Sequence, residues 1–261
     1  MGELVLILGP NGSGKSRFAE RFLDARAGGA RFYSATMLPQ TEENARRIAK
    51  HRAQRAGLGF QTLERPWFVS GAPVTPGSAV LLEDVSNLLA NAIFAPAGDA
   101  RNAEAPPESA DAPAAPRTAR IAAEIVGEIG ADVAGEIPAN AVGERAADVA
   151  GEIPANAVGK RAADAAGEIP ANAARECAAD AAGEIAAEVA ADIAALRARC
   201  ALLVCVTISG LTPAGITDAG TVAYIAALNA LNRRLLEDAD AAAQMRGGVP
   251  HAVKGVWNEI V

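Results

Sequence analysis

The sequence predicts an α/β fold in which a mostly parallel sheet is flanked by helices. Three observations support this prediction. Short apolar segments alternate with amphipathic ones through residues 1–94, the same texture returns in 198–261, and a glycine-rich loop joins the first apolar segment to the amphipathic one after it. Strands that alternate with helices over short connections are typical of parallel sheets covered by helices on both faces.

The first part of the chain contains three expected strands, each an apolar run of the kind that is buried in parallel sheets. These strands lie at 3–8, 31–36 and 79–83. Each expected strand is followed by an expected helix, of which the first is amphipathic and the second is rich in charged residues. These helices cover 15–26, 40–54 and 84–94.

Residues 95–197 differ in composition from both neighbours, and we interpret them as an insert. The chain is 51% hydrophobic but only 4% aromatic, because alanine is concentrated in this region. The hexapeptide GEIPAN begins at Gly135, Gly151 and Gly167, and a diverged copy, GEIAAE, begins at Gly183. A proline in each of the first three copies breaks a helix, and copies sixteen residues apart would be rotated by roughly 160° on one helix. We therefore expect short alanine-rich helices or disorder in a surface loop, with an interaction arm as the alternative.

The last part of the chain, residues 198–261, returns to the texture of a folded domain. A strand is expected at 201–207, a leucine-patterned helix at 221–245 and a final strand at 252–256. The predicted organisation is one core made from 1–94 and 198–261, interrupted by the insert. Without the insert, the remaining length suits one compact domain.

Charge and composition exclude several classes of protein. The net charge is −7, whereas proteins that bind nucleic-acid backbones need clustered Lys and Arg, so no nucleic-acid partner is expected. No apolar run approaches the length that spans a bilayer, and the amino terminus lacks the features of a signal peptide. The three cysteines have no metal-ligand spacing, and their odd number suits a reducing compartment. We therefore expect a cytoplasmic protein without a membrane span.

The strongest motif is a G-x-x-x-x-G-K-S segment between the first expected strand and the first expected helix. It consists of Gly9, Pro10, Asn11, Gly12, Ser13, Gly14, Lys15 and Ser16. The glycines let successive backbone N–H groups point inward, and the helix amino terminus adds positive partial charge, so the segment predicts a P-loop for ATP or GTP. Lys15 would reach the β- and γ-phosphates, and Ser16 would supply a hydroxyl to Mg²⁺. The expected fold is therefore of the P-loop NTPase type.

Two carboxylates, Glu83 and Asp84, follow the third expected strand. In P-loop proteins an acidic residue at such a strand end helps to hold Mg²⁺. Both residues are candidates, but the alternation of side chains along a strand would direct only one of them to the site. Asp84 has the alternative role of capping the helix that follows.

Another candidate site residue is His51, which lies in residues 46–55 beside four Arg and one Lys. Neighbouring positive charge disfavours the cationic imidazole, and a neutral imidazole is a competent nucleophile toward phosphorus. The basic residues would stabilise a triphosphate and its transition state. The alternative is a solvated basic helix with an incidental histidine. The chain lacks an LSGGQ-like signature of transporter ATPases, and its size favours a small-molecule kinase or a nucleotidyltransferase.

These segments resemble the bifunctional adenosylcobinamide kinase / adenosylcobinamide-phosphate guanylyltransferase family of cobalamin biosynthesis. The resemblance runs through the P-loop and SRFAERF, then RFYSATM, ARRIAKHRAQRAGLGFQTLE and AVLLEDVSNLLANAIF, and more weakly through LLVCVTISG and ALNALNRRLLEDADA. The family's R-I-x-x-H-x-x-x-R and T-x-E elements fall on Arg47, Ile48, His51, Arg55, Thr62 and Glu64. Its strand-end acid falls on Glu83, and its N-L-L helix falls approximately on Asn91.

The resemblance implies two reactions at one nucleotide site. A nucleoside triphosphate first phosphorylates the aminopropanol hydroxyl of adenosylcobinamide. GTP then transfers GMP to His51 with loss of pyrophosphate, and the cobinamide phosphate takes up the GMP to give adenosylcobinamide-GDP. The implied partners are a nucleoside triphosphate and a corrinoid, and the family also implies a homo-oligomer.

The resemblance also implies roles for individual residues. Lys15 and Ser16 act with Mg²⁺ on the phosphates, while Arg47 and Arg55 stabilise developing charge. Glu64 and Glu83 join the P-loop residues and Arg47 in the nucleotide site, and Glu83 also joins Ser16 at the metal.

The second part of the chain departs from the family pattern. Its N-E-V-G-x-G-I-V-P segment corresponds to 207–213, where Ser209 replaces the acid, and an F-R-D triplet falls on 224–226 without either charge. Asn232 and Asp240 keep their places. Two alternatives therefore stand beside the transferase: a P-loop kinase for another small hydroxylated metabolite, and a nucleotide-dependent regulatory or scaffolding protein without transferase activity.

Overall fold

The structure is a computed structural model that describes residues 1–39, 42–55, 57–94, 171–255 and 257. These residues form a seven-stranded sheet with the order β3-β2-β4-β5-β1-β6-β7. The strands are β1 (Glu3–Gly9), β2 (Arg31–Ala35), β3 (Phe60–Glu64), β4 (Ala79–Glu83), β5 (Leu202–Ile208), β6 (Ala241–Arg246) and β7 (Val249–Lys254). The pairing is parallel except between β6 and β7, which confirms the predicted α/β class with a mostly parallel sheet.

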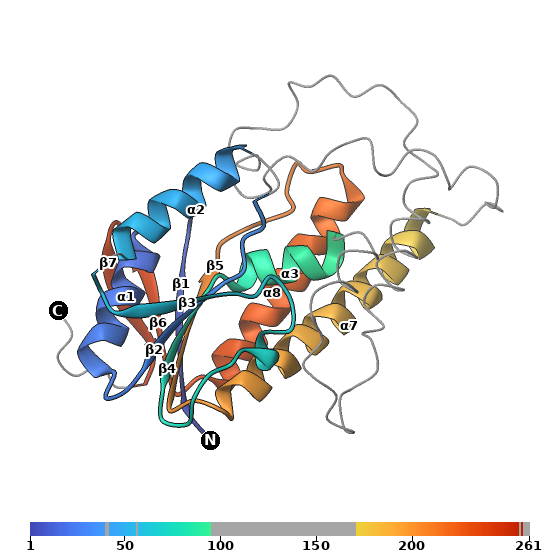
Figure 1. The fold of residues 1–261 in the computed structure, drawn as a ribbon. Coiled ribbons are helices and arrows are strands. Elements are labelled where there is room, and N and C mark those ends of the chain that lie inside the picture. The colour runs from blue at the N-terminus through green and yellow to red at the C-terminus, as the bar shows by residue number, and fades with distance from the viewer. Residues whose placement is uncertain (40–41, 56, 95–170, 256, 258–261) are drawn as a thin grey trace.

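Helices cover both faces of this sheet (Figure 1). They are α1 (Lys15–Arg26), α2 (Glu42–Arg55), α3 (Val85–Phe94), α7 (Ala171–Arg197) and α8 (Ala219–Asp238), with a 3₁₀ turn, η1, at Val69–Gly71. Because successive side chains of a strand point to opposite faces, β1 serves two cores. Leu4, Leu6 and Leu8 pack with α3, α7 and α8. Val5 and Ile7 pack on the other face with α1.

Three elements toward the edges of the sheet differ from what the sequence predicts. The strand β3 was not predicted, because it is a short edge strand with mostly polar, exposed side chains. The helix expected over 221–245 ends at Asp238, and Ala241–Arg246 forms β6 instead. Alanines 241–243 favour helix by intrinsic propensity, but their pairing with the buried strand β1 overrides that preference. The last strand is β7, which begins earlier than the 252–256 that we expected.

The insert predicted over 95–197 extends into the core at its carboxyl-terminal end. Residues 95–170 lie outside the described part of the chain, whereas 171–197 form the 27-residue helix α7. Its apolar side chains at 185, 189, 193 and 196 have helical spacing and are buried against α3, α8 and η1. The expectation of only short helices or disorder is therefore wrong for α7. The alanine content shared with the repeats concealed this apolar stripe.

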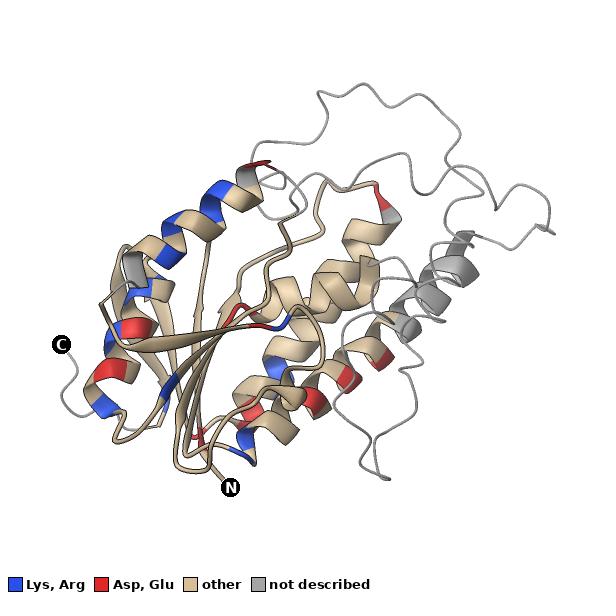
Figure 2. Cartoon of the chain, viewed as in Figure 1, with Lys and Arg blue, Asp and Glu red and all other residues tan. Residues whose placement is uncertain are grey.

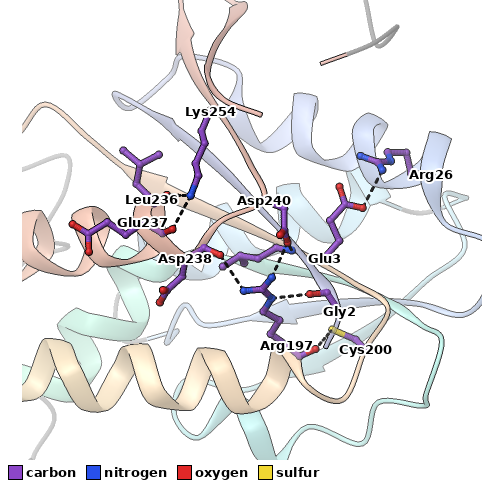
Figure 3. Close-up of polar contacts among 11 residues, drawn as sticks. Gly2, Glu3, Arg26, Arg197, Cys200, Leu236, Glu237, Asp238, Asp240 and Lys254 are labelled. Atoms are coloured by element: carbon purple, nitrogen blue, oxygen red, sulfur yellow. Dashed lines mark hydrogen bonds and ion pairs between the residues drawn. The ribbon is translucent and has the colours of Figure 1, made fainter. Parts of the chain in front are cut away.

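A set of polar contacts joins α7 to the amino-terminal edge of the sheet (Figure 3). Arg197 donates from Nε to the Gly2 carbonyl at 2.7 Å and from Nη1 to the Asp238 carbonyl at 3.0 Å. Its Nη2 also pairs with Asp240 at 2.7 Å. The same carboxylate of Asp240 accepts the Leu4 N–H at 2.8 Å. One guanidinium thus ties α7, the start of β1 and the end of α8 together.

Truncating a core side chain of α7 tests whether this helix is part of the folded core. Ile185 is fully buried, so Ile185→Ala should lower the free energy of unfolding by about 2–5 kcal/mol. The measurement is urea unfolding of the full chain. The control is Glu184→Ala, at an exposed position on the same helix, which should change stability by less than about 0.5 kcal/mol. Equal effects of the two substitutions would contradict the packing of α7.

Candidate functional site

The glycine-rich loop lies between β1 and α1, at the edge where the parallel strands end. Gly12 and Gly14 have φ angles of 70° and 83°, a backbone conformation that residues other than glycine rarely adopt. Gly14 forms the N-cap of α1, and its carbonyl accepts the Phe18 N–H at 3.0 Å. The helix therefore begins at Lys15 with its free backbone N–H groups at the loop, an arrangement that attracts anions.

Lys15 and Ser16 occupy the first turn of α1, where Lys15 contacts the loop and Ser16 contacts the end of β4. Lys15 is buried and donates from Nζ to the Pro10 carbonyl at 3.1 Å. Burial lowers the pKa of the Lys15 ammonium group, while Asp84 and Glu83 act against that shift. The Ser16 hydroxyl donates to Oε1 of Glu83 at the end of β4. The fold thus brings Lys15, Ser16 and Glu83 together, as the sequence predicts.

Asp84 takes the second of its two predicted roles and caps α3. Its Oδ1 accepts the Ser86 hydroxyl at 2.6 Å and the Asn87 N–H at 2.7 Å. Its backbone is held by Thr36, whose hydroxyl contacts both the N–H and the carbonyl of Asp84 at 2.8 Å. Only Glu83 therefore presents its carboxylate to Ser16.

Glu83 is held in an environment that disfavours its charge. Burial raises its pKa to about 7, with a further contribution from Asp84 and Glu20, while the Ser16 hydrogen bond acts in the opposite direction. Glu20 is itself buried and lies four residues after Ser16, on the same side of α1. The sequence analysis did not single out Glu20. Its spacing from Ser16 was the available signal, because a carboxylate on the buried side of a helix is unusual.

The oxygen atoms of this cluster suit a magnesium ion. Mg²⁺ prefers hard oxygen ligands and usually combines one or two protein oxygens with substrate phosphates and water. Ser16 offers a hydroxyl and Glu83 a carboxylate, and Oε2 of Glu83 is buried and accepts no hydrogen bond within the described residues. In the described ranges, no group of three or more His, Cys, Asp or Glu side chains is arranged to hold a metal by itself.

The other predicted residues lie on α2 and at the end of β3. Arg47 and His51 are four residues apart, on one face of α2, and both are partly buried. Arg55 is the last residue of α2, and its side chain lies outside the described part of the structure. Figure 2 shows Lys and Arg spaced along α2, in contrast to the Asp and Glu of α7. For Arg47 and His51, a shared helix face is established, and their approach to the loop stays a prediction.

Glu64 lies at the same sheet edge as Glu83, because both residues pair in register with Ala35 of β2. It forms an ion pair with Arg52, the residue after His51. This ion pair joins α2 to the edge of the sheet where the glycine-rich loop lies. Arg52 is a contact that the sequence analysis did not single out.

The residues in the weakly matched second part have mainly structural contacts. Asn232 is buried and bonds the Thr207 hydroxyl at 2.7 Å and the Ile208 carbonyl at 2.8 Å, which holds the end of β5. Ser209 follows β5 directly, and its N–H donates to the Gly9 carbonyl at 3.2 Å. The Tyr224 hydroxyl donates to the Ser86 carbonyl at 3.3 Å. These contacts hold the end of β5, join it to the end of β1 and connect α8 to the start of α3.

The sheet order defines an α/β protein with a mostly parallel sheet, in which β5 lies between the strand that leads into the glycine-rich loop and the strand that ends in Glu83. A family model described as cobinamide kinase / cobinamide phosphate guanyltransferase matches residues 5–182, which is more than half of the chain. The chain belongs to this family.

A curated relative agrees with this assignment over a shorter stretch. The chain is similar to the bifunctional adenosylcobalamin biosynthesis protein CobP of Pseudomonas aeruginosa, with 52% identity over 61 residues. The match covers 23% of this chain and 34% of the relative, so the chain spans about a third of the relative's length. Among the described helices, none is long and apolar enough to cross a membrane.

The raised pKa of Glu83 predicts how stability depends on pH. The folded carboxyl group, with a pKa of about 7, keeps a proton that the unfolded chain loses near pH 4.5, so stability falls as pH rises through this window. Glu83→Gln removes this dependence. Between pH 4.5 and pH 8, the free energy of unfolding of wild type should therefore fall by up to about 3 kcal/mol more than that of Glu83→Gln.

The measurement is urea unfolding at both pH values, without added nucleotide or Mg²⁺. Glu184→Gln, at an exposed position, is the matched control and should follow the wild-type pH dependence. A Glu83→Gln variant with the same pH dependence as wild type would show that this carboxyl group is already charged near neutral pH.

Proposed function

We propose that this chain phosphorylates adenosylcobinamide and then transfers GMP from GTP to adenosylcobinamide phosphate, in cobalamin biosynthesis. The proposal depends on the two contacts at the glycine-rich loop, Lys15 with the Pro10 carbonyl and Ser16 with Glu83, in a member of the cobinamide kinase / guanyltransferase family. The nucleotide, ATP or GTP, would bind with its phosphates at the amino terminus of α1.

In the kinase step, the hydroxyl oxygen of the aminopropanol group attacks the γ-phosphorus of the triphosphate. The bond from that phosphorus to the β–γ bridging oxygen breaks, the nucleoside diphosphate leaves with the electron pair of that bond, and the hydroxyl proton passes to water. Phosphate oxygens are stronger acceptors than the Pro10 carbonyl, so they would take over the Lys15 ammonium group. Ser16 and Glu83 would hold Mg²⁺, which neutralises charge on the phosphate oxygens.

In the transferase step, an imidazole nitrogen of His51 attacks the α-phosphorus of GTP. The bond to the α–β bridging oxygen breaks and pyrophosphate leaves, so His51 carries GMP through a nitrogen–phosphorus bond. A phosphate oxygen of adenosylcobinamide phosphate then attacks this phosphorus, which yields adenosylcobinamide-GDP and restores His51. Arg47 lies on the same face of α2, and Arg55 ends that helix, where their charges would stabilise the transition state.

The ion pair between Arg52 and Glu64 supports this assignment of His51. It holds the residue next to His51 at the sheet edge that also carries Glu83. Glu64 would remain near the nucleotide in this arrangement.

The wider setting of the enzyme follows from the same reasoning. We place it in the cytoplasm, where Cys200 and Cys205, both buried and unpaired, would stay reduced. We also propose a homo-oligomer, and a core built from 1–94 and the carboxyl-terminal part, with the repeats as an insert.

Loss of the Lys15 ammonium group should strongly slow the first reaction. Lys15→Met keeps an apolar stem in a buried site, so the fold should persist while the kinase rate falls by about 10²-fold or more. The measurement is phosphate transfer from γ-labelled ATP or GTP to adenosylcobinamide. Lys254→Met is the control and should retain the activity, because the Lys254 ammonium group donates to backbone carbonyls of α8.

The covalent intermediate can be tested because the chain has only two histidines, His51 and His251. Incubation with α-labelled GTP and Mg²⁺ should leave acid-labile, alkali-stable label on the wild-type protein. His51→Ala should lose the label, and His251→Ala should keep it. Removal of the nucleophile should leave phosphorylation of adenosylcobinamide within about threefold of wild type, since the γ-phosphoryl transfer does not use it.

The other outcomes separate the alternatives. Label that survives in His51→Ala would refute this residue as the carrier. Phosphorylation of adenosylcobinamide without any label would leave a kinase alone, and neither activity with nucleotide still bound would favour a regulatory or scaffolding protein.

A further inference from the structure

The turn between β6 and β7 lies directly against the glycine-rich loop. The strand β6 runs parallel to β1 and pairs Gln244 with Leu8, one residue before the loop. A side chain on Gly9 would come within 3.0 Å of Met245 Cβ, and one on Gly14 within 4.0 Å of Gly248 Cα. The end of β6 and the turn after it therefore lie close to the loop, near both of the loop's ends.

Arg246 lies between these two contacts along the chain, and its side chain is exposed. Gly247 and Gly248 follow it with φ angles of 56° and 82°, which allow the chain to reverse tightly beside the loop. Met245, the residue before Arg246, lies close to Gly9 of the loop, and Gly247, the residue after it, begins the turn. The backbone of Arg246 is therefore held at this edge of the sheet as the last residue of β6.

The guanidinium group is oriented by a neutral partner. Its Nε and Nη2 donate to Oε1 of Gln244 at 3.3 and 2.8 Å. Gln244 and Arg246 lie two residues apart on one strand and so share a face. Within the described residues no carboxylate forms an ion pair with Arg246. Gln244 therefore orients the guanidinium group but does not neutralise its charge.

An oriented, unneutralised guanidinium beside an anion-binding loop suits phosphate. Its planar donor groups match the oxygens of a phosphate better than the point charge of a lysine does. Lys15 and the amino terminus of α1 approach the loop from the side of α1. Arg246 is the last residue of β6, which pairs with β1 on the side away from β5.

We propose that Arg246, positioned by Gln244, binds the phosphate chain of the nucleoside triphosphate held in the glycine-rich loop. The inference rests on the proposed nucleotide site and adds a residue from the far end of the chain to it. Arg246 would contribute to the affinity for the triphosphate independently of Lys15.

The test is a titration of the full-length protein, with Mg²⁺, by GTP and separately by inorganic tripolyphosphate. Arg246→Ala should raise the Kd for both probes by about tenfold, because one charge-assisted contact is lost. Arg246→Lys should lie between Arg246→Ala and wild type. Arg234→Ala, at an exposed position on α8, is the matched control and should bind like wild type.

The role of Gln244 has its own readout. Gln244→Ala should weaken binding of both probes by a smaller factor than Arg246→Ala. In the Arg246→Ala background it should have no further effect, whereas a merely structural role would give additive losses. Thermal unfolding of each variant without ligand shows whether the fold is kept.

Three results would overturn the inference. Unchanged affinity of Arg246→Ala for both probes would exclude a contact with the nucleotide. A loss for GTP without a loss for tripolyphosphate would assign Arg246 to the nucleoside instead of the phosphates. Failure of wild type to bind either probe would refute the proposed nucleotide site itself, and this inference with it.

Discussion

The pairing of β1 with β5 on one side and β6 on the other determines where the candidate site lies. Because these strands are parallel and in register, their carboxyl ends meet at one edge, and the loop after Gly9 must curl over that edge. The strand β5 separates β1 from β4, so Glu83 faces the first turn of α1 across one intervening strand. Asn232 holds the end of β5 through the Ile208 carbonyl, and the Ser209 N–H joins that end to the Gly9 carbonyl, where the loop begins.

The same edge concentrates charge where water is largely excluded. Burial disfavours the charged forms of both Lys15 and Glu83. It therefore lowers the pKa of Lys15 and raises the pKa of Glu83. Such groups are costly to bury unless a partner of opposite charge compensates them. A triphosphate with its metal ion would supply both partners, anionic for Lys15 and cationic for Glu83. The proposed nucleotide complex would therefore compensate both groups.

The parts of this edge that could be predicted from sequence are those with local signals. The loop, Lys15, Ser16 and the acid at the end of β4 follow from short motifs next to apolar runs, and the structure brings them together. The edge strand β3 and the strand β6 carry no such signal, because exposed polar residues and alanines acquire their strand conformation only by pairing with β2 and β1. The neighbourhood of Arg246 was unpredictable for the same reason, since it depends on the parallel pairing of residues more than 230 positions apart.

The helix α7 shows how composition and spacing can lead to different conclusions about one segment. Its copy of the repeat, which begins at Gly183, has Ala186 where each earlier copy has proline. Ala186 is buried in the core, and a proline there would remove a helical hydrogen bond and clash with the preceding turn. Ile193 and Leu196 extend the apolar stripe at positions where the preceding copy has Cys177 and Asp180. The copy that packs in the core is therefore the one whose sequence permits an unbroken helix with apolar residues along one face. The alanines that all copies share do not determine which copy packs there.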